Sequence, residues 1–323
     1  MTLGGVRINI CAGNLNLRAG EFMKKIAVSG ATSMLGVATI KEFLARGTEV
    51  IAIVHRNSKN FYRLPQSTNL KIVEANLDEL SKCPAEFEGV EVFYHFAWAA
   101  TTHGGRLNVD AQELNIRHTL DAVRLAERWG CRKFIFAGSQ AEYGLSDKPL
   151  NRETPINPVT AYGVSKYAAG KLAEMLCRSL GITFVWLRIV STYGINDGAN
   201  TLISYVVDSY RKNRQPVLTA CEQIWDYLHA DDAARAFRLL GECQTSGVYV
   251  TGSGKGLKLK TYIETIYRLM NPQVPLVFGG KAYSENQVMH LEADISDLRR
   301  DTGFEPRISF EEGISRILSE LAT

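Results

Sequence analysis

The sequence predicts an α/β protein built on a doubly wound parallel sheet, with a smaller C-terminal lobe. Three observations predict this class. Short apolar, β-type runs alternate with amphipathic helical segments through the first part of the chain. The first such run leads into a glycine-containing turn that opens a helix. Beyond about residue 190 the alternation becomes less regular, which indicates a second lobe that closes over the edge of the sheet.

Composition narrows the function classes. The 323 residues are 46% hydrophobic and 22% charged, with a net charge of +3, as in an ordinary globular protein. No Lys/Arg run argues for a nucleic-acid partner, and no apolar run reaches the ~18 residues that would span a membrane. The six cysteines lie far apart without a C-x-x-C motif, which favours reduced thiols, no metal site and a cytoplasmic location.

The chain divides into three parts in this interpretation. Residues 1–22 form an N-terminal extension without the apolar core of a signal peptide. Residues 23–190 form the dinucleotide-binding domain. Residues 191–323 form mainly the substrate-binding lobe, interleaved with the first domain.

The first unit begins with a strand over 25–29, followed by the turn Gly30–Gly36 and a helix over 37–46. Gly30 permits a tight turn, and Gly36 lets helix and strand pack closely. The N–H groups at the start of the helix are suited to a pyrophosphate. Ser33 stands where a middle glycine is usual, and its hydroxyl can itself hold a phosphate.

The second strand, 49–54, ends at His55 and Arg56. An NAD site usually carries an acidic residue here to hold the ribose 2′-hydroxyl, and none is present. The guanidinium of Arg56 instead suits a 2′-phosphate, so NADP(H) is favoured and NAD(H) is the alternative. The competing interpretation of Arg56 is a solvated loop residue.

Two further strands are expected over 70–75 and 90–95. The first ends at Asn76 and Leu77, where an adenine can lie. The second contains His95, interpreted as a core histidine, and leads into a segment of small residues that a cofactor ribose can approach. In the loop that follows, Thr102 and His103 are candidates for the substrate pocket. His103 is either a second proton donor or an exposed loop residue.

A long helix over 109–129 contains Asn115, which is unfavourable in mid-helix unless it makes a specific contact. The fifth strand, 133–138, delivers Ser139 at its carboxyl end, where α/β sheets bind ligands. A proline-punctuated loop then leads to a helix that carries Tyr162 and Lys166. The chain continues with a sixth strand over 182–189, a strand over 247–251 and helices over 201–212, 260–270 and 310–321, while 226–240 starts extended and becomes helical.

Tyr162 and Lys166 are four residues apart, so a helix presents both on one face. A phenol titrates near ~10 and is a poor base at neutral pH, but a neighbouring ammonium lowers its pKa. Such a pair can exchange a proton with a sugar hydroxyl or ketone. The alternative for an isolated Tyr-x-x-x-Lys is a half-buried tyrosine beside a solvated lysine.

Taken in order, these motifs resemble the extended short-chain dehydrogenase/reductase family, in particular its nucleotide-sugar epimerases, dehydratases and reductases. The resemblance runs from about Lys24 to Leu321. The matching residues are Gly30 and Gly36 in GATSMLG, His95 to Ala97, Asn115, Ser139 in FAGSQAEYG, Tyr162 and Lys166 in YGVSK, Arg188 with Tyr193-Gly194, Asp231-Asp232 in DYLHADDAARA, and Asp294 and Gly303 to Pro306 near the end.

The resemblance implies a Rossmann domain and assigns roles. Tyr162 would be the general acid/base, Lys166 would hold the nicotinamide ribose and adjust Tyr162, and Ser139 would hydrogen-bond the reacting oxygen. The expected cofactor-binding residues are Gly30, Thr32, Ser33, Met34, Leu35, Gly36, His55, Arg56, Asn76, Leu77, Phe96, Ala97, Trp98, Asn115, Tyr162, Lys166 and Ile189. The expected substrate-binding residues are Thr102, His103, Gln140, Ala141, Ser191 and Trp225.

The departures from the family pattern narrow the activity. Dehydratases of this family carry acidic residues directly after the serine or threonine, where this chain has Gln140 and Ala141. Many members also bind substrate pyrophosphate with an arginine at the position of Trp225, which can stack on a base.

We therefore expect an NADP(H)-dependent reductase of a 4-keto hexose on a nucleoside diphosphate. The alternatives are a redox-neutral nucleotide-sugar 4-epimerase with retained NAD(P) and, more remotely, a non-catalytic cofactor sensor. The resemblance also suggests a homodimer formed by the helices that contain Asn115 and Tyr162.

Overall fold

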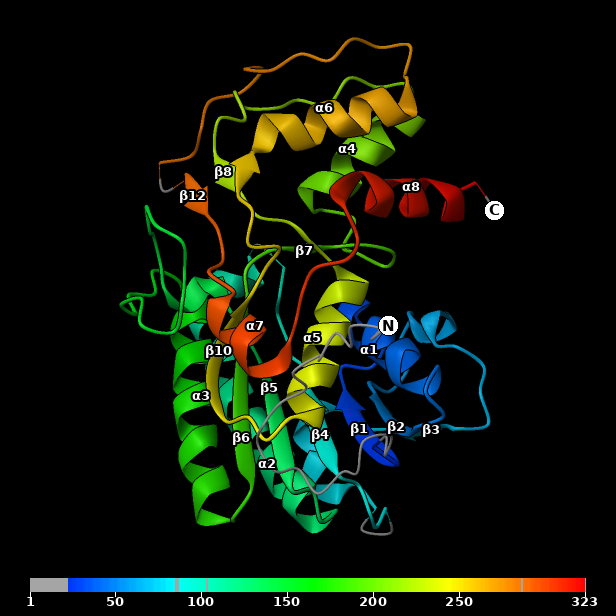
Figure 1. Cartoon of the computed structure of the whole chain (residues 1–323), viewed down its shortest axis with the longest axis vertical. Coiled ribbons are helices and arrows are strands. Elements are labelled where there is room, and N and C mark those ends of the chain that lie inside the picture. The colour runs from blue at the N-terminus through cyan, green and yellow to red at the C-terminus, as the bar shows by residue number, and fades with distance from the viewer. Residues whose placement is uncertain (1–22, 85–86, 103, 286, 323) are drawn as a thin grey trace, which may run out of the picture.

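The computed structural model describes residues 23–84, 87–102, 104–285 and 287–322. Its centre is a seven-stranded sheet in the order β10-β6-β5-β4-β1-β2-β3, in which every neighbouring pair is parallel (Figure 1). The strands are β1 (Lys25–Ser29), β2 (Glu49–Val54), β3 (Leu70–Glu74), β4 (Val92–His95), β5 (Lys133–Ser139), β6 (Thr183–Ile189) and β10 (Gly247–Thr251). The predicted doubly wound parallel sheet is confirmed.

Helices cover both faces of the sheet. The pair α1 (Met34–Leu44) and α5 (Ala230–Glu242) packs on one face, and the pair α2 (Val109–Arg128) and α3 (Ala161–Ser179) packs on the other. Side chains of a strand alternate between faces, so Ile26 and Val28 join the core under the first pair while Ala27 joins the core under the second. Both faces are therefore apolar, as a parallel sheet requires.

Short 3-10 turns lie in the connections that follow β2, β3, β4 and β5. They are η1 (Phe61–Arg63), η2 (Leu77–Lys82), η3 (Gly105–Leu107) and η4 (Gln140–Glu142). Helix α1 begins at Met34, earlier than the expected 37, because the hydroxyl of Ser33 accepts a hydrogen bond from the backbone N–H of Gly36 at 3.0 Å and caps the helix.

A smaller unit lies above the sheet in Figure 1 and has its own apolar core. Its helices are α4 (Leu202–Arg211), α6 (Leu259–Met270) and α8 (Phe310–Glu320), and its short strands are β8 (Ile224–Trp225), β11 (Leu257–Lys258) and β12 (His290–Leu291). The two-stranded sheet of β7 (Thr192–Tyr193) and β9 (Leu228–His229) lies where the chain passes between the units. The chain returns twice to the large unit, first with α5 and β10 and then with α7 (Ser296–Thr302).

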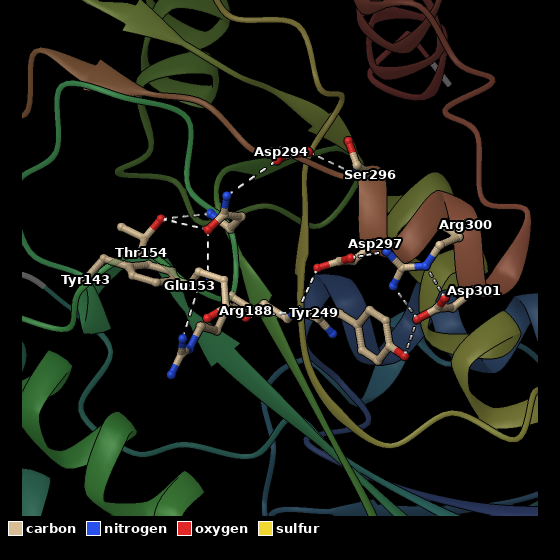
Figure 2. Close-up of polar contacts among 12 residues, drawn as sticks. Tyr143, Glu153, Thr154, Arg188, Tyr249, Asp294, Ser296, Asp297, Arg300 and Asp301 are labelled. Atoms are coloured by element: carbon tan, nitrogen blue, oxygen red, sulfur yellow. Dashed lines mark hydrogen bonds and ion pairs between the residues drawn. The ribbon is translucent and has the colours of Figure 1, made fainter.

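The second return ties the C-terminal part to the loop that precedes α3. Figure 2 shows Asp294 and Asp297 facing this loop, where Arg152 is 2.9 Å from Asp297 and Asn151 donates to Asp294 at 3.5 Å. The backbone N–H of Leu150 also donates to the carbonyl of Glu292 at 2.7 Å. These contacts join the segment around the start of α7 to the loop between β5 and α3.

The strand order changes direction between β1 and β4, which are neighbours although β2 and β3 separate them in sequence. The loops after these two strands diverge from this point, which is where open parallel sheets bind ligands. Across the described ranges, none of the helices combines the length and the apolar character needed to cross a bilayer.

Candidate active site

The turn after β1 is shaped for a dinucleotide. Gly30 has φ +70, and a Cβ at this position would lie 2.7 Å from the backbone nitrogen of Ala97. A Cβ at Gly36 would collide with the carbonyl of Gly30. Only glycine allows the turn, the helix and the loop after β4 to approach so closely. Thr32, Ser33, Met34 and Leu35 form the rest of this turn, so the residues present fit a pyrophosphate.

The ends of β2 and β3 lie beside each other at the same edge. His55 and Arg56 are exposed, and the Arg56 backbone N–H donates to Asn76 at 3.2 Å. The side chain of Arg56 donates through Nε to Glu79 at 2.8 Å, and Glu79 in turn caps the turn that begins at Leu77. Arg56 is thus at the predicted strand end, but it has an acidic partner that the sequence analysis did not include.

The segment after β4 packs against Gly30 and is hydrogen-bonded to α2. Phe96 and Ala97 are half-buried next to Gly30, and the Trp98 indole N–H donates to Gln112 at 2.8 Å. Asn115 is buried and makes reciprocal hydrogen bonds with the backbone of Ala99, at 2.8 and 3.2 Å. This is the specific contact that a mid-helix asparagine needs, and it fixes the course of the segment.

The remaining two predicted residues of this region, His95 and Ile189, lie at the ends of β4 and β6. His95 is buried, lies 2.7 Å from the hydroxyl of Ser29, and has its pKa lowered by burial to about 3, as the interpretation of a neutral core histidine requires. Ile189 is half-buried at the end of β6.

Ser139 and Tyr162 meet at the carboxyl end of β5. Both are nearly buried, and the Ser139 side chain is close enough to Tyr162 to lower the pKa of its phenol. Thr160 caps α3 by accepting from the N–H of Gly163 at 3.1 Å, which sets where the helix begins and places Tyr162 in its first turn. Burial raises the pKa of Tyr162, and the charge of Arg106 and the side chain of Ser139 oppose this rise. The phenol is therefore protonated at neutral pH and suited to donate its proton.

Lys166 lies on the same face of α3, but its ammonium has other neighbours. Its Nζ donates to the carbonyl of Ala137 at 2.8 Å and lies 3.8 Å from the centre of the Trp98 ring, against 5.9 Å for the Tyr162 ring. Burial lowers the pKa of Lys166 to about 7. Of these two cations, Arg106 lies nearer the Tyr162 ring, at 4.2 Å against 5.9 Å, and its charge is the largest influence that opposes the rise in the pKa of Tyr162.

A buried ion pair between Glu142 and Arg188 is hydrogen-bonded to the backbone of Ser139. Glu142 accepts from the backbone N–H of Ser139 at 2.7 Å and lies 2.6 Å from Nε of Arg188, and both side chains are almost inaccessible. Arg188 also donates to the hydroxyl of Tyr143 at 3.0 Å. Burial raises the pKa of Glu142, and Arg188 opposes the rise. The 3-10 turn over 140–142 directs this carboxylate into the protein, so it cannot replace the missing dehydratase acids.

Two cavities include residues that the sequence predicts for substrate binding. One of about 610 Å³ is lined by Arg106, which contacts the Tyr162 ring, and by Gln140, Ala141 and Thr160. Another, of about 670 Å³, lies in the smaller unit and brings together Ser191 and Trp225, whose indole donates to the Ser191 hydroxyl at 3.1 Å. Thr102 is exposed and its carbonyl accepts from the N–H of Arg106 at 2.9 Å. His103 lies outside the described residues.

The residue that the sequence analysis missed is Arg106. Its Cζ lies 4.2 Å from the centre of the Tyr162 ring. Its signal in the sequence is weak, because it is an arginine after two glycines in an irregular loop that also contains His103.

The comparisons with known proteins agree with this geometry. Residues 26–252 match the model of the NAD dependent epimerase/dehydratase family. The CDP-abequose synthase of Salmonella muenchen is 25% identical over 92% of this chain and 97% of its own. The dTDP-4-dehydro-6-deoxyglucose reductase of Escherichia coli is 23% identical over 92% and 97%. The UDP-glucose 4-epimerase of Thermotoga maritima, solved with UDP-glucose, superposes with a TM-score of 0.82 at 20% identity, over 92% of this chain and 99% of that one.

The family match spans well over half of the chain and includes the glycine turn, Ser139, Tyr162 and Lys166. This chain belongs to the NAD dependent epimerase/dehydratase family and is an enzyme of that family.

Proposed function

We propose that this enzyme is an NADP(H)-dependent reductase of a 4-keto hexose carried on a nucleoside diphosphate. The observation that carries the proposal is a protonated, buried Tyr162 near Ser139, with Gln140 and Ala141, which stand where dehydratases carry acidic residues, lining a neighbouring cavity. A proton donor next to a hydroxyl, with Gln140 and Ala141 in place of an acidic pair, suits reduction of a carbonyl better than elimination of water.

The residues of the chain have separable tasks in this reaction. When bound, the reduced nicotinamide supplies the hydride for the carbonyl carbon. Ser139 donates a hydrogen bond to the carbonyl oxygen and orients it. Tyr162 transfers its phenolic proton to the same oxygen, so the product is an alcohol and the tyrosine is left as phenolate. Lys166, in the first turns of α3, is the residue we assign to the ribose of the cofactor.

The two cavities support a two-part substrate. We assign the sugar to the cavity of about 610 Å³ next to Tyr162, and the nucleoside diphosphate to the cavity of about 670 Å³ with Trp225 and Ser191. The second cavity also includes Lys281 and Gln223, and its aromatic and polar lining suits a base and its phosphates. The proposal is tested by measuring whether the enzyme oxidises NADPH when, and only when, a keto-sugar nucleotide is added. If no keto-sugar nucleotide in a panel of bases and sugars consumes NADPH or NADH, the proposal fails.

A preference for NADP(H) is part of the proposal and depends on Arg56. In the described residues, its side chain is paired only through Nε with Glu79, which leaves the outer guanidinium nitrogens for a 2′-phosphate. We expect Arg56→Ala to weaken NADPH binding about tenfold or more and NADH binding less than about twofold, because a hydrogen bond to a charged group contributes about 1.5–3 kcal/mol. Calorimetric titration with both cofactors measures this.

The matched control is Arg132→Ala, which removes another exposed, ion-paired arginine at the opposite end of the sheet. It is expected to change neither affinity. Equal losses for NADPH and NADH in Arg56→Ala would remove the argument for NADP(H).

A redox-neutral 4-epimerase is the second candidate. The structural similarity to the epimerase of Thermotoga maritima favours it. The use of the cofactor distinguishes an epimerase from a reductase. An epimerase purifies with its nicotinamide cofactor and interconverts hydroxyl epimers without added NADPH, whereas a reductase consumes NADPH in proportion to product.

We also propose that the enzyme is a homodimer through α2 and α3. Leu114 on α2 and Val164, Leu172 and Met175 on α3 expose apolar side chains on the outer face of this helix pair. Met175→Glu is expected to shift the protein from dimer to monomer in sedimentation velocity. Leu257→Glu, at an exposed leucine of the smaller unit, is the control and is expected to leave the mass unchanged. A wild-type protein that sediments as a monomer would contradict this proposal.

A further inference from the structure

The loop after β4 holds Arg106 against the catalytic tyrosine. Gly105 packs so closely on Ala100 that a Cβ there would lie 2.8 Å from the Ala100 carbonyl. Gln112 on α2 donates to the carbonyls of Ala100 and Gly105, at 2.9 Å each. The buried Gln112 thus fixes both ends of the turn. Arg106 is consequently presented by an anchored turn rather than by a free loop.

The contact between Arg106 and Tyr162 is close and has two parts. The guanidinium carbon lies 4.2 Å from the ring centre, within the range of a cation–π interaction. The charge of Arg106 is also the largest of the influences that oppose the rise in the pKa of Tyr162. A guanidinium keeps its charge at any pH at which the enzyme works, so this positive charge is permanent.

The ammonium of Lys166 lies farther from the Tyr162 ring than the guanidinium of Arg106 does. Its Nζ is committed to the carbonyl of Ala137 and to the faces of Trp98 and Phe136, at 3.8 and 4.9 Å from the ring centres. Burial also lowers its pKa to about 7, so part of the population is neutral at neutral pH. The other charged groups around Tyr162 among the described residues are Glu142, below Ser139, and Glu285, which shares the cavity with Arg106.

We propose that Arg106 is a positioning residue of the catalytic centre, whose guanidinium holds the Tyr162 ring and stabilises the phenolate formed when the proton leaves. The inference rests on the proposed function of Tyr162. In the reductive direction the phenolic O–H bond breaks, a new O–H bond forms on the sugar, and the electron pair stays on the phenol oxygen beside Arg106. In the oxidative direction the same phenolate accepts the proton of a sugar hydroxyl.

The direct test measures the ionisation of Tyr162 without any substrate. The tyrosinate absorbance of the protein is titrated with NADP⁺ bound, because the positive nicotinamide ring favours the phenolate, and the titration of Tyr162→Phe is subtracted. We expect Arg106→Met to raise the pKa of Tyr162 by about one unit or more, which is about tenfold less phenolate at a given pH. Arg106→Lys is expected to fall between Arg106→Met and the wild type, because it keeps the charge but not the planar contact.

Arg124→Met is the matched control, because Arg124 is an exposed arginine of α2 that pairs with Asp121. It is expected to leave the titration unchanged. An unchanged pKa of Tyr162 in Arg106→Met, in protein with native circular dichroism and native cofactor affinity, would overturn the inference. Because this measurement needs no turnover, it tests the role of Arg106 independently of which substrate the enzyme uses.

The pH profile gives a second readout. For ketone reduction, kcat/KM falls as pH rises through the pKa of Tyr162, since the proton donor is lost. Arg106→Met is expected to lower the plateau and to move this falling limb to higher pH by about the same one unit. A purely structural role would lower the plateau without moving the limb, and that result would also overturn the inference.

Discussion

Tyr162→Phe is expected to lower the turnover of this enzyme by about 10²–10⁴-fold, the usual contribution of a positioned general acid. Phenylalanine keeps the ring that packs against Trp98 at 6.0 Å and the guanidinium of Arg106 at 4.2 Å, so the helix and its neighbours remain in place. What is lost is the hydroxyl that meets Ser139. Steady-state rates with a keto-sugar nucleotide measure the effect, and cofactor binding is expected to change little.

Tyr167→Phe is the control for this substitution. Tyr167 lies on the same helix, five residues later, and packs against Trp186 at 5.9 Å between ring centres. Its loss of a hydroxyl is expected to change turnover less than about twofold. A Tyr162→Phe enzyme with turnover within about tenfold of wild type would show that another group supplies the proton and would remove the catalytic assignment.

Glu142→Ala is expected to lower the free energy of unfolding by about 3–5 kcal/mol, because it leaves the buried Arg188 without its anion. The carboxylate is completely buried, and it also accepts the backbone N–H of Ser139 at 2.7 Å and the indole N–H of Trp186 at 3.3 Å. Urea unfolding monitored by tryptophan fluorescence measures the change. Because one of these bonds fixes Ser139, the folded fraction is also expected to lose activity.

Two controls distinguish the loss of a charge as such from the loss of a buried partner. Glu153→Ala removes a carboxylate that is 83% exposed and paired with Arg152, so it is expected to cost less than about 1 kcal/mol. The double variant Glu142→Leu/Arg188→Met replaces both partners with apolar groups and is expected to recover much of the stability lost in Glu142→Ala. If Glu142→Ala unfolds at the same urea concentration as wild type, the buried pair does not carry the stability assigned to it.

Much of the site was accessible from the sequence because it depends on local geometry. The strand before Gly30 and the helix after it require a tight turn there, and a four-residue spacing on a helix puts Tyr162 and Lys166 on one face in any context. Ser139 follows from its place at the end of a buried strand. The unusual position of Asn115 in mid-helix also predicted a specific contact, and its partner is the backbone of Ala99.

The remaining features depend on segments that meet only in the folded chain. The strand over 247–251 follows the irregular part of the sequence, yet it completes the main sheet by pairing with β6. Arg56 has a partner in Glu79 from the turn after β3, which no periodicity links to it.

The chain's own pattern thus determined the parallel sheet and the glycine turn after its first strand, since strands and helices repeat at fixed periods that residue types reveal. The tertiary structure alone decided which cation faces Tyr162. Lys166 reaches the Ala137 carbonyl because α3 packs against β5, and Arg106 reaches the phenol because Gln112 folds an irregular loop back over it. Such loops have no period, so their side chains are positioned by contacts distant in the sequence.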